Sequence, residues 1–253
     1  MQYCLDTFII ISYNQNIHIS GDFMKKSITI ILAGLFSFVC ILSINSIGSD
    51  YDEISVSYSD KVNLVIDAGH GGIDAGAVGT DNSLEKDINL SIAQKLYDFA
   101  MVSGISSFLI RDGDYLYYDV GDDKSRSDLY NRYDFVNSVP NSTLISIHQN
   151  HFTDEKENGM QIWYSPNDSE SKILADSILT ISKDNLQKNN TRENKKSDDS
   201  YYLLYKAKVP SVMVECGFMS NAEENKQLQD NAYQNKLAYS IMLGFCEYLI
   251  EEN

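Results

Sequence analysis

The stretch 62–79, VNLVIDAGHGGIDAGAVG, constrains the fold more than any other part of this chain. It opens with an apolar run, 62–66, that is typical of a buried strand. It then becomes a loop with five glycines that also holds Asp67, His70 and Asp74. Because α/β proteins bind ligands where strands end in such loops, this stretch predicts a site at the carboxyl edge of a sheet.

The glycine-rich loop does not match the common phosphate-binding patterns. A G-x-G-x-x-G motif would need glycine in place of Asp74, and a Walker motif would need lysine in place of Ala77. His70 is therefore the residue to explain. A single histidine is more often structural than a metal ligand, so a metal site requires partners further along the chain.

Composition limits the possible functions. The 253 residues are 43% hydrophobic, which suits one globular α/β domain, and the formal net charge is −16. Such a charge argues against nucleic acid as a partner, and against docking to polyanionic wall polymers by charge alone. The four cysteines form no C-x-x-C motif, so neither a thioredoxin-like centre nor a zinc ribbon is indicated. We expect Cys216 and Cys246 to be buried free thiols rather than a disulfide.

The amino-terminal part has the pattern of an exported protein from Met24 onward. Met24 is followed by two lysines and by the apolar run 28–44, which is typical of a signal peptide or a membrane anchor. Basic residues before such a run favour export of the remainder, and contact with a membrane is expected only through this run, if it is not cleaved. The predicted divisions are an untranslated or non-native extension, 1–23; the signal or anchor, 24–44; a linker, 45–60; and the globular domain, 61–253.

Strands and helices alternate along the globular domain. Such alternation predicts a single α/β domain with a mainly parallel sheet and helices on both faces. The expected helices are 85–103, 124–137, 169–188 and 231–251, with a polar loop at 187–200. The further expected strands are 105–110, 143–147, 160–165, 201–205 and 211–215.

Polar side chains follow two of these strands. His148 comes directly after strand 143–147, and Glu215 ends strand 211–215. Because parallel strands end at the same edge of a sheet, both should lie near His70. Glu85, at the start of a helix reached from the glycine loop, can arrive there too.

Two imidazoles and one carboxylate with an open fourth position form a catalytic zinc site, and a further carboxylate can serve as general base. These considerations alone leave open whether Glu85 or Glu215 is the ligand. Glu85 could also be no more than a favourable acid at a helix start.

Four motifs resemble, in order, the zinc N-acetylmuramoyl-L-alanine amidases of bacterial cell walls. They are DAGHGGIDAG (67–76), LEKDINL (84–90), SIHQNHF (146–152) and VPSVMVECGFMSN (209–221), and the resemblance covers about 60–251. It implies a six-stranded sheet, an extracytoplasmic location and one zinc ion per domain. It also implies that His70, Glu85 and His148 are the zinc ligands and that Glu215 is the catalytic base.

Within that family, the segments LEKDINL, YYLLYKAKVP and VECGFMSN resemble the germination-specific type of spore formers. This implies hydrolysis of the amide between N-acetylmuramic acid and L-alanine in peptidoglycan during spore cortex maturation, so that muramic lactam can form. The expected location is the cell wall or the forespore intermembrane space. The expected partners are glycan strands with stem peptides and an exported or lipoprotein activator. There is no room between His148 and Gly159 for the long inhibitory helix of some cell-division amidases.

Three alternatives remain open. The chain could be a general cell-wall autolysin, or a non-catalytic peptidoglycan-binding module, although a module would be expected to have lost some of the ligands. It could also be a cysteine hydrolase with Cys216 as nucleophile and His148 as base, which leaves His70 and Glu85 unused.

Other polar residues have weaker predicted roles. Asp67 could orient the glycine loop or hydrogen-bond a ligand histidine, and Asn150 could hold the loop or the substrate carbonyl. His151 is not expected to bind the metal itself. We expect it to contact the metal ligands from outside or to face the substrate. Arg192, like Arg111 and Arg132, could meet a carboxylate of the stem peptide, but solvated surface or ion pairs are the simpler interpretation for all three.

Overall fold

The computed structural model describes residues 62–117 and 124–251. The described residues belong to one compact unit, Ser57–Asn253. The expectations for 1–23, 24–44 and 45–60 lie outside the described residues. Among the helices that the structure describes, none is long and apolar enough to cross a membrane.

A six-stranded sheet forms the centre of the domain, in the order β2-β1-β3-β6-β4-β5. The pairings of β1 with β2 and β3, and of β3 with β6, are parallel, whereas β4 runs antiparallel to β6. The predicted fold, a mainly parallel six-stranded α/β sheet, is confirmed. The strands are β1 Asn63–Ala68, β2 Ser107–Leu109, β3 Ser142–Asn150, β4 Gln161–Tyr164, β5 Lys195–Lys196 and β6 Ser211–Phe218.

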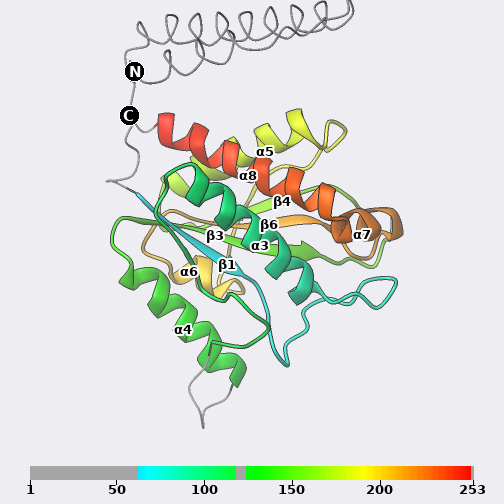
Figure 1. Cartoon of the computed structure of the whole chain (residues 1–253), viewed down its shortest axis with the longest axis horizontal. Helices are drawn as coiled ribbons and strands as arrows, with labels where there is room; N and C mark the ends of the chain where they lie inside the picture. The colour runs from blue at the N-terminus through cyan, green and yellow to red at the C-terminus, as the bar shows by residue number, and fades with distance from the viewer. Residues whose placement is uncertain (1–61, 118–123, 252–253) are drawn as a thin grey trace, which may run out of the picture. The chain divides into compact units, whose positions relative to one another are not determined.

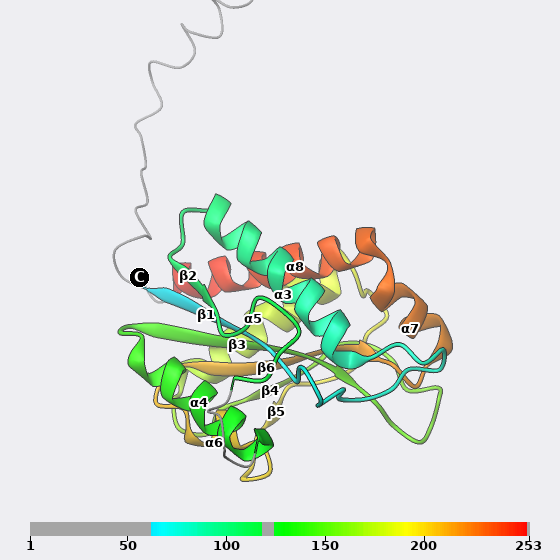
Figure 2. The same cartoon turned by 60° about the horizontal axis from the view of Figure 1, so that its bottom comes forward.

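Helices cover both faces of the sheet (Figures 1 and 2). One face packs against α3, α5 and α8 and holds the larger apolar core, which includes Ile66, Leu96 and Phe245. The other face packs against α4 and α6 over a smaller core that includes Val65 and Leu203. The helices are α3 Glu85–Val102, α4 Lys124–Ser138, α5 Glu170–Asn185, α6 Tyr202–Lys206, α7 Ala222–Gln229 and α8 Asn231–Glu251.

One predicted strand is wrong. The stretch 201–205, chosen for its tyrosines, is mostly the short helix α6, Tyr202–Lys206. Strand propensity measures fit to a half-buried sheet position rather than an intrinsic preference, and β5 already occupies this edge of the sheet. A turn, in which the Tyr201 N–H bonds the Asp198 carbonyl, instead starts a helix that buries Leu203 against the α4 side.

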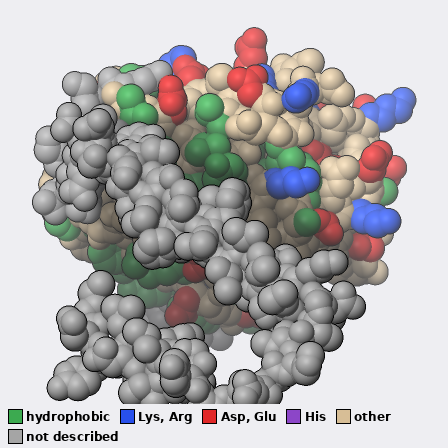
Figure 3. Space-filling view, turned by 45° about the horizontal axis from the view of Figure 1, so that its top comes forward, with side chains coloured by type: hydrophobic (Ala, Val, Ile, Leu, Met, Phe, Trp, Pro, Cys, Tyr) green, Lys and Arg blue, Asp and Glu red, His purple; other side chains and the backbone are tan. Residues whose placement is uncertain are grey.

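Two elements were not predicted. Strand β5 has only two residues and lies within the expected polar loop 187–200. Helix α7 begins after Asn221, whose side chain accepts hydrogen bonds from the N–H groups of Glu223 and Glu224. An asparagine cap followed by acidic residues is a recognisable helix start. The face in Figure 3 shows acidic and basic side chains interspersed, as expected of a solvated surface.

Candidate active site

Three side chains that are far apart in the sequence meet at the carboxyl edge of the sheet. His70 follows β1, Glu85 opens α3 and His148 lies in β3. One ligand atom from each lies within 4.8 Å of the other two. Oε2 of Glu85 is 3.2 Å from Nε2 of His70, and its Oε1 is 3.1 Å from Nδ1 of His148. The structure thus brings these three residues together, and they could hold a metal ion.

His70 has a left-handed backbone conformation, with φ of 63°. This region is strained for a residue with a Cβ atom, and such strain gathers at functional sites. Two arginines fix the surrounding carbonyl groups. Arg132 donates to the carbonyls of Ala68 and His70, each at 2.8 Å, and Arg111 donates to those of Ala68 and Gly69. Arg111 is fully buried, so neither a solvated nor a substrate-facing role applies to it.

Two glycines of the loop allow the metal-binding groups to come close to the backbone. A Cβ atom on Gly69 would lie 2.2 Å from the His148 ring. A Cβ atom on Gly76 would lie 2.5 Å from Oε2 of Glu85 and 2.6 Å from the His70 ring. Gly76 also has a φ of 67°, which glycine adopts without strain. Crowding around the three candidate ligands therefore explains two of the five glycines of the loop, Gly69 and Gly76.

The Glu85 carboxylate is buried and tightly held. Its Oε2 accepts a hydrogen bond from the Ala77 N–H at 2.8 Å, and its Oε1 accepts one from the Gln149 N–H at 3.0 Å. Burial alone would raise the pKa of Glu85, but hydrogen bonds and charge from His148 and His70 hold that pKa well below its usual range. The carboxylate therefore stays negatively charged, as a metal ligand must.

A second carboxylate orients the His70 ring. Nδ1 of His70 lies 2.9 Å from Oδ2 of Asp74, which leaves Nε2 facing Glu85. Burial opposes the charged imidazolium, yet Glu85 and Asp74 together raise the pKa of His70 to about 9. Two roles were predicted for Asp67, and one of them was a hydrogen bond to a ligand histidine. That hydrogen bond is not formed by Asp67, because Asp74 occupies this position beside His70.

Asp67 supports the loop from beneath. It is 2% exposed, forms an ion pair with Arg132, and accepts a hydrogen bond from the Ser146 hydroxyl at 2.6 Å. Burial would raise the pKa of Asp67, but the charge of Arg132 lowers that pKa below its usual value. Arg132 also donates to the His70 carbonyl, so Asp67 contacts the loop through Arg132. Its role in orienting the loop stays a prediction.

Glu215 lies beside the three candidate ligands. It is paired in register with His148 on the neighbouring parallel strand, and both strands continue past their predicted ends. Its Oε2 is buried and has no hydrogen-bond partner among the described residues. Burial raises the pKa of Glu215 to about 7. An uncommitted carboxylate with a pKa near neutrality suits a general base.

Two cavities adjoin the site, and Tyr201 lines both of them. One, of about 220 Å³, is lined by His70 and His148. The other, of about 360 Å³, is lined by Glu215 and extends toward β4 and β5. The candidate base and the candidate metal ligands thus face adjacent hollows on the α4 and α6 side of the sheet.

Two of the three remaining predicted site residues, Asn150 and Arg192, line the second cavity. Asn150, at the end of β3, lines it. Arg192 also lines it, forms an ion pair with Glu157 and stacks 4.2 Å above the Phe218 ring. His151 is exposed and does not belong to the group that could hold a metal.

The cysteine-hydrolase alternative finds no support. Cys216 is fully buried in the apolar core on the other face of the sheet, and burial raises the pKa of its thiol. A nucleophilic cysteine needs an accessible thiol with a lowered pKa. Both described cysteines, Cys216 and Cys246, are free thiols as predicted, but only Cys216 is buried, whereas Cys246 is half-buried.

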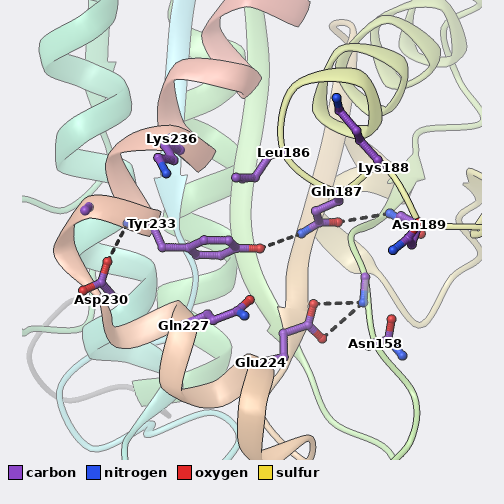
Figure 4. A pocket seen from close by; sticks show the side chains of 13 residues that line it. Asn158, Leu186, Gln187, Lys188, Asn189, Glu224, Gln227, Asp230, Tyr233 and Lys236 are labelled. Atoms are coloured by element: carbon purple, nitrogen blue, oxygen red, sulfur yellow. Dashed lines mark hydrogen bonds between the residues drawn. The ribbon is translucent and has the colours of Figure 1, made fainter.

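A larger cavity, of about 480 Å³, shares no lining residue with these two (Figure 4). Its central polar groups already bond within the protein. Gln187 donates to the Tyr233 hydroxyl and to the Cys216 carbonyl, and Glu224 accepts from the N–H groups of Gly159 and Phe218. These contacts brace the end of β6 just past Glu215, and the cavity holds no candidate metal ligands.

A sheet edge that joins two imidazoles and a carboxylate beside a second, half-buried carboxylate is typical of metal-dependent hydrolases. The model of one such family, Amidase_3 or N-acetylmuramoyl-L-alanine amidase, matches residues 64–247. The chain belongs to this family, and it is an N-acetylmuramoyl-L-alanine amidase whose substrate is peptidoglycan. Because this is a family of cell-wall amidases, an extracytoplasmic place of action follows.

Individual proteins that are similar to this chain in sequence and in structure are also amidases. The chain is 32% identical over 202 residues to the germination-specific N-acetylmuramoyl-L-alanine amidase of Bacillus subtilis, covering 78% of this chain and 84% of that protein. The CwlD amidase of Clostridioides difficile, solved in complex with the GerS lipoprotein, matches with a TM-score of 0.72 and 38% identity, covering 75% and 98%. The amidase AmiC2 of Nostoc punctiforme matches with a TM-score of 0.66 and 30% identity, covering 76% and 99%.

Proposed function

We propose that the chain is a zinc-dependent amidase that removes stem peptides from muramic acid in the spore cortex, where muramic lactam then forms. The observation that carries the proposal is the convergence of His70, Glu85 and His148 next to the uncommitted carboxylate of Glu215. Two nitrogen donors and one charged oxygen donor suit zinc, and three protein ligands leave a position open for a reactant. Zinc held there would polarise the amide carbonyl and lower the pKa of a water molecule to about 7.

The proposed reaction is hydrolysis of the amide between the lactyl group and L-alanine. A water oxygen forms a bond to the carbonyl carbon, and the bond from that carbon to the alanine nitrogen breaks. Glu215 takes a proton from the water and passes a proton to the leaving nitrogen. Its half-buried position and its pKa of about 7 fit a group that must both accept and return a proton.

Residues around the site are proposed to hold the substrate. Asn150 and Arg192 line the cavity beside Glu215, where they can contact the peptide part. His151 is exposed and is proposed to face the substrate rather than the metal.

The cortex role is supported by the two relatives just described, one named germination-specific and the other a CwlD amidase. The second was solved with a lipoprotein, and we propose an exported or lipoprotein activator for this chain as well. The described loop 151–160 contains no helix, so restraint by compartment or partner is the expected form of control. Segment 24–44 is proposed to direct the domain to the cell wall or the forespore intermembrane space.

One experiment tests the chemistry and another tests the biological role. Purified chain, with and without a chelator, is incubated with peptidoglycan, and released peptides with a free L-alanine amine are measured by mass spectrometry. We expect release that stops with the chelator and returns with zinc. In spores that lack the chain, we expect cortex without muramic lactam. Defective separation of growing cells with normal cortex would support the general autolysin instead.

A further inference from the structure

The cavity beside Glu215 has an aromatic wall. The rings of Trp163 and Tyr201 stack 4.7 Å apart, and the Phe218 ring lines the same cavity. Trp163 lies on β4, whose Gln161 pairs in register with Glu215. The wall therefore lies one strand away from the proposed base, on the same face of the sheet.

Two cations border this wall. Arg192 lies over the Phe218 ring, and the Lys195 ammonium lies 5.1 Å from the centre of the Trp163 ring. Arg192 is already paired with Glu157, whereas Lys195 forms no ion pair with any described residue. The chain has a net charge of −16, so its acidic groups outnumber the lysines and arginines that could pair with them. A lysine without an ion pair on the same side of the sheet as Glu215 is therefore available to bind a negatively charged group.

The cavity that holds the two histidines has a different character. Its lining includes Asp67, Asp74 and Asp128, of which Asp67 and Asp128 are paired with Arg132 and Asp74 lies against the His70 ring. No lysine lines this cavity, whereas Lys195 lines the one beside Glu215. The two cavities therefore differ in whether a cation without an ion pair is available to a substrate carboxylate.

We propose that the cavity beside Glu215 is the stem-peptide subsite, and that Lys195 binds the free carboxylate of the residue after L-alanine. The proposal rests on the assignment of Glu215 to the reaction. Lys195, on β5, pairs with Trp163, whereas Glu215 pairs with Gln161, two residues earlier on β4. The Lys195 backbone therefore lies about 10 Å across two strands and about 7 Å along them, roughly 12 Å from that of Glu215. A peptide advances about 3.5 Å per residue, and its second residue comes within reach of the lysine side chain. The aromatic wall packs against the alanine methyl group and the peptide backbone.

The test compares two soluble substrates and two neighbouring lysines. The substrates are muramoyl-L-alanyl-D-isoglutamate with its γ-carboxylate blocked as an amide, as the next residue of a stem peptide would block it, and the same compound with its α-carboxylate also converted to an amide. The variants are Lys195→Met, which keeps the aliphatic stem over Trp163, and Lys196→Met as control. Lys196 carries the same charge on the next residue, but it pairs with Tyr164, points to the other face by strand alternation and does not line the cavity.

We expect the wild-type chain to prefer the acid over the amide by about fivefold in kcat/KM, a value at the upper end for an exposed ion pair. Lys195→Met should abolish this preference through KM, Lys195→Glu should reverse it, and Lys196→Met should retain it. Calorimetry with the product of the acid substrate, L-alanyl-D-isoglutamate blocked in the same way, should show the same order of affinities without any turnover.

Three outcomes would overturn the subsite. The first is an equal loss of kcat/KM on both substrates in Lys195→Met, and the second is the same effect in Lys196→Met. The third is a loss of kcat/KM that grows with glycan length rather than with peptide charge, which would assign the aromatic wall to sugar. If the wild-type chain cleaves neither substrate yet still binds the acidic peptide through Lys195, the subsite stands and the proposed reaction fails.

Discussion

Oε1 of Glu85 lies 3.1 Å from Nδ1 of His148, although the two residues are 63 positions apart in the sequence. The contact joins the first turn of α3 to the end of β3, and the same carboxylate reaches His70 through its other oxygen. A divalent cation could enter between this carboxylate and the two imidazoles and replace their mutual contacts with direct bonds to each of them. Removing any one of these side chains should therefore weaken metal binding, which can be measured.

The first prediction concerns metal content. We expect His70→Ala and Glu85→Gln to weaken zinc binding by more than about 100-fold, because removing a ligand costs more than disturbing its neighbours. His151→Ala is the control, since this histidine is exposed and outside the group. Atomic absorption after dialysis measures the bound zinc. Full zinc content in His70→Ala, or loss of zinc in His151→Ala, would refute the assigned ligand set.

The second prediction concerns the pH dependence of zinc binding. Glu85 and Asp74 raise the pKa of His70 to about 9, so zinc must displace a proton from this ring below that pH. The apparent zinc affinity should therefore rise about tenfold per pH unit up to about pH 9. Competition with a chromophoric chelator measures it.

Asp74→Asn removes one cause of the raised pKa of His70, so its affinity curve should level off at a lower pH. Asp98→Asn on the exposed side of α3 removes the same charge and should leave the curve unchanged. A curve that is flat from pH 6 to 9 in the wild-type chain would show that His70 carries no proton to displace.

The third prediction concerns the buried pair beneath the loop. Arg132→Met leaves Asp67 buried without its cation, and we expect a loss of about 3–5 kcal/mol in the free energy of unfolding. Arg126→Met, at an exposed position of the same helix where Arg126 bonds the Tyr130 hydroxyl, should change it by no more than about 1 kcal/mol. Adding Asp67→Asn to Arg132→Met should recover part of the loss, because it removes the uncompensated charge. Urea unfolding of the metal-free proteins, prepared with a chelator, measures the free energy of unfolding of each variant. Equal losses of this free energy in Arg132→Met and Arg126→Met would contradict the argument.

Much of this site could be predicted because its main residues stand at the ends of apolar strands. His70, His148 and Glu215 could be placed at one edge of the sheet because each stands at or just after the end of a predicted parallel strand. The choice between Glu85 and Glu215 as ligand needed the family resemblance, since both are acids near that edge. The structure separates them physically: Glu85 lies between two imidazoles, whereas Glu215 has an oxygen without a partner.

Other contributions could not be found from local pattern. Arg132 supports the loop from a helix 62 positions away from His70, and only the fold brings the two together. Asp74 was visible in the loop, and its spacing of four residues from His70 was the available signal for their contact. Tyr201 lies outside the four family motifs. Because a strand was predicted for 201–205, the position of Tyr201 between the two cavities could not be foreseen.

The last prediction concerns Glu215, whose proposed role has a cost in stability. Burial raises the pKa of this carboxyl from 4.5 to about 7 in the folded chain. Above pH 4.5 the unfolded chain therefore loses this proton more readily than the folded chain. The free energy of unfolding thus falls as pH rises from about 4.5 to about 7 and stays lower above that range.

Glu215→Gln removes this penalty together with the base. At pH 8, without metal, we expect the variant to be more stable than the wild type by about 2–3 kcal/mol, and at pH 4 the two should be equal. With normal zinc content, peptide release should fall roughly 10²–10⁴-fold because the glutamine amide cannot accept and return the proton. Urea unfolding at both pH values, zinc analysis and release assays on the same preparations check the three expectations. Lost zinc would make Glu215 a ligand, retained activity would place the base elsewhere, and equal stability at pH 8 would show that its carboxylate is already compensated in the fold.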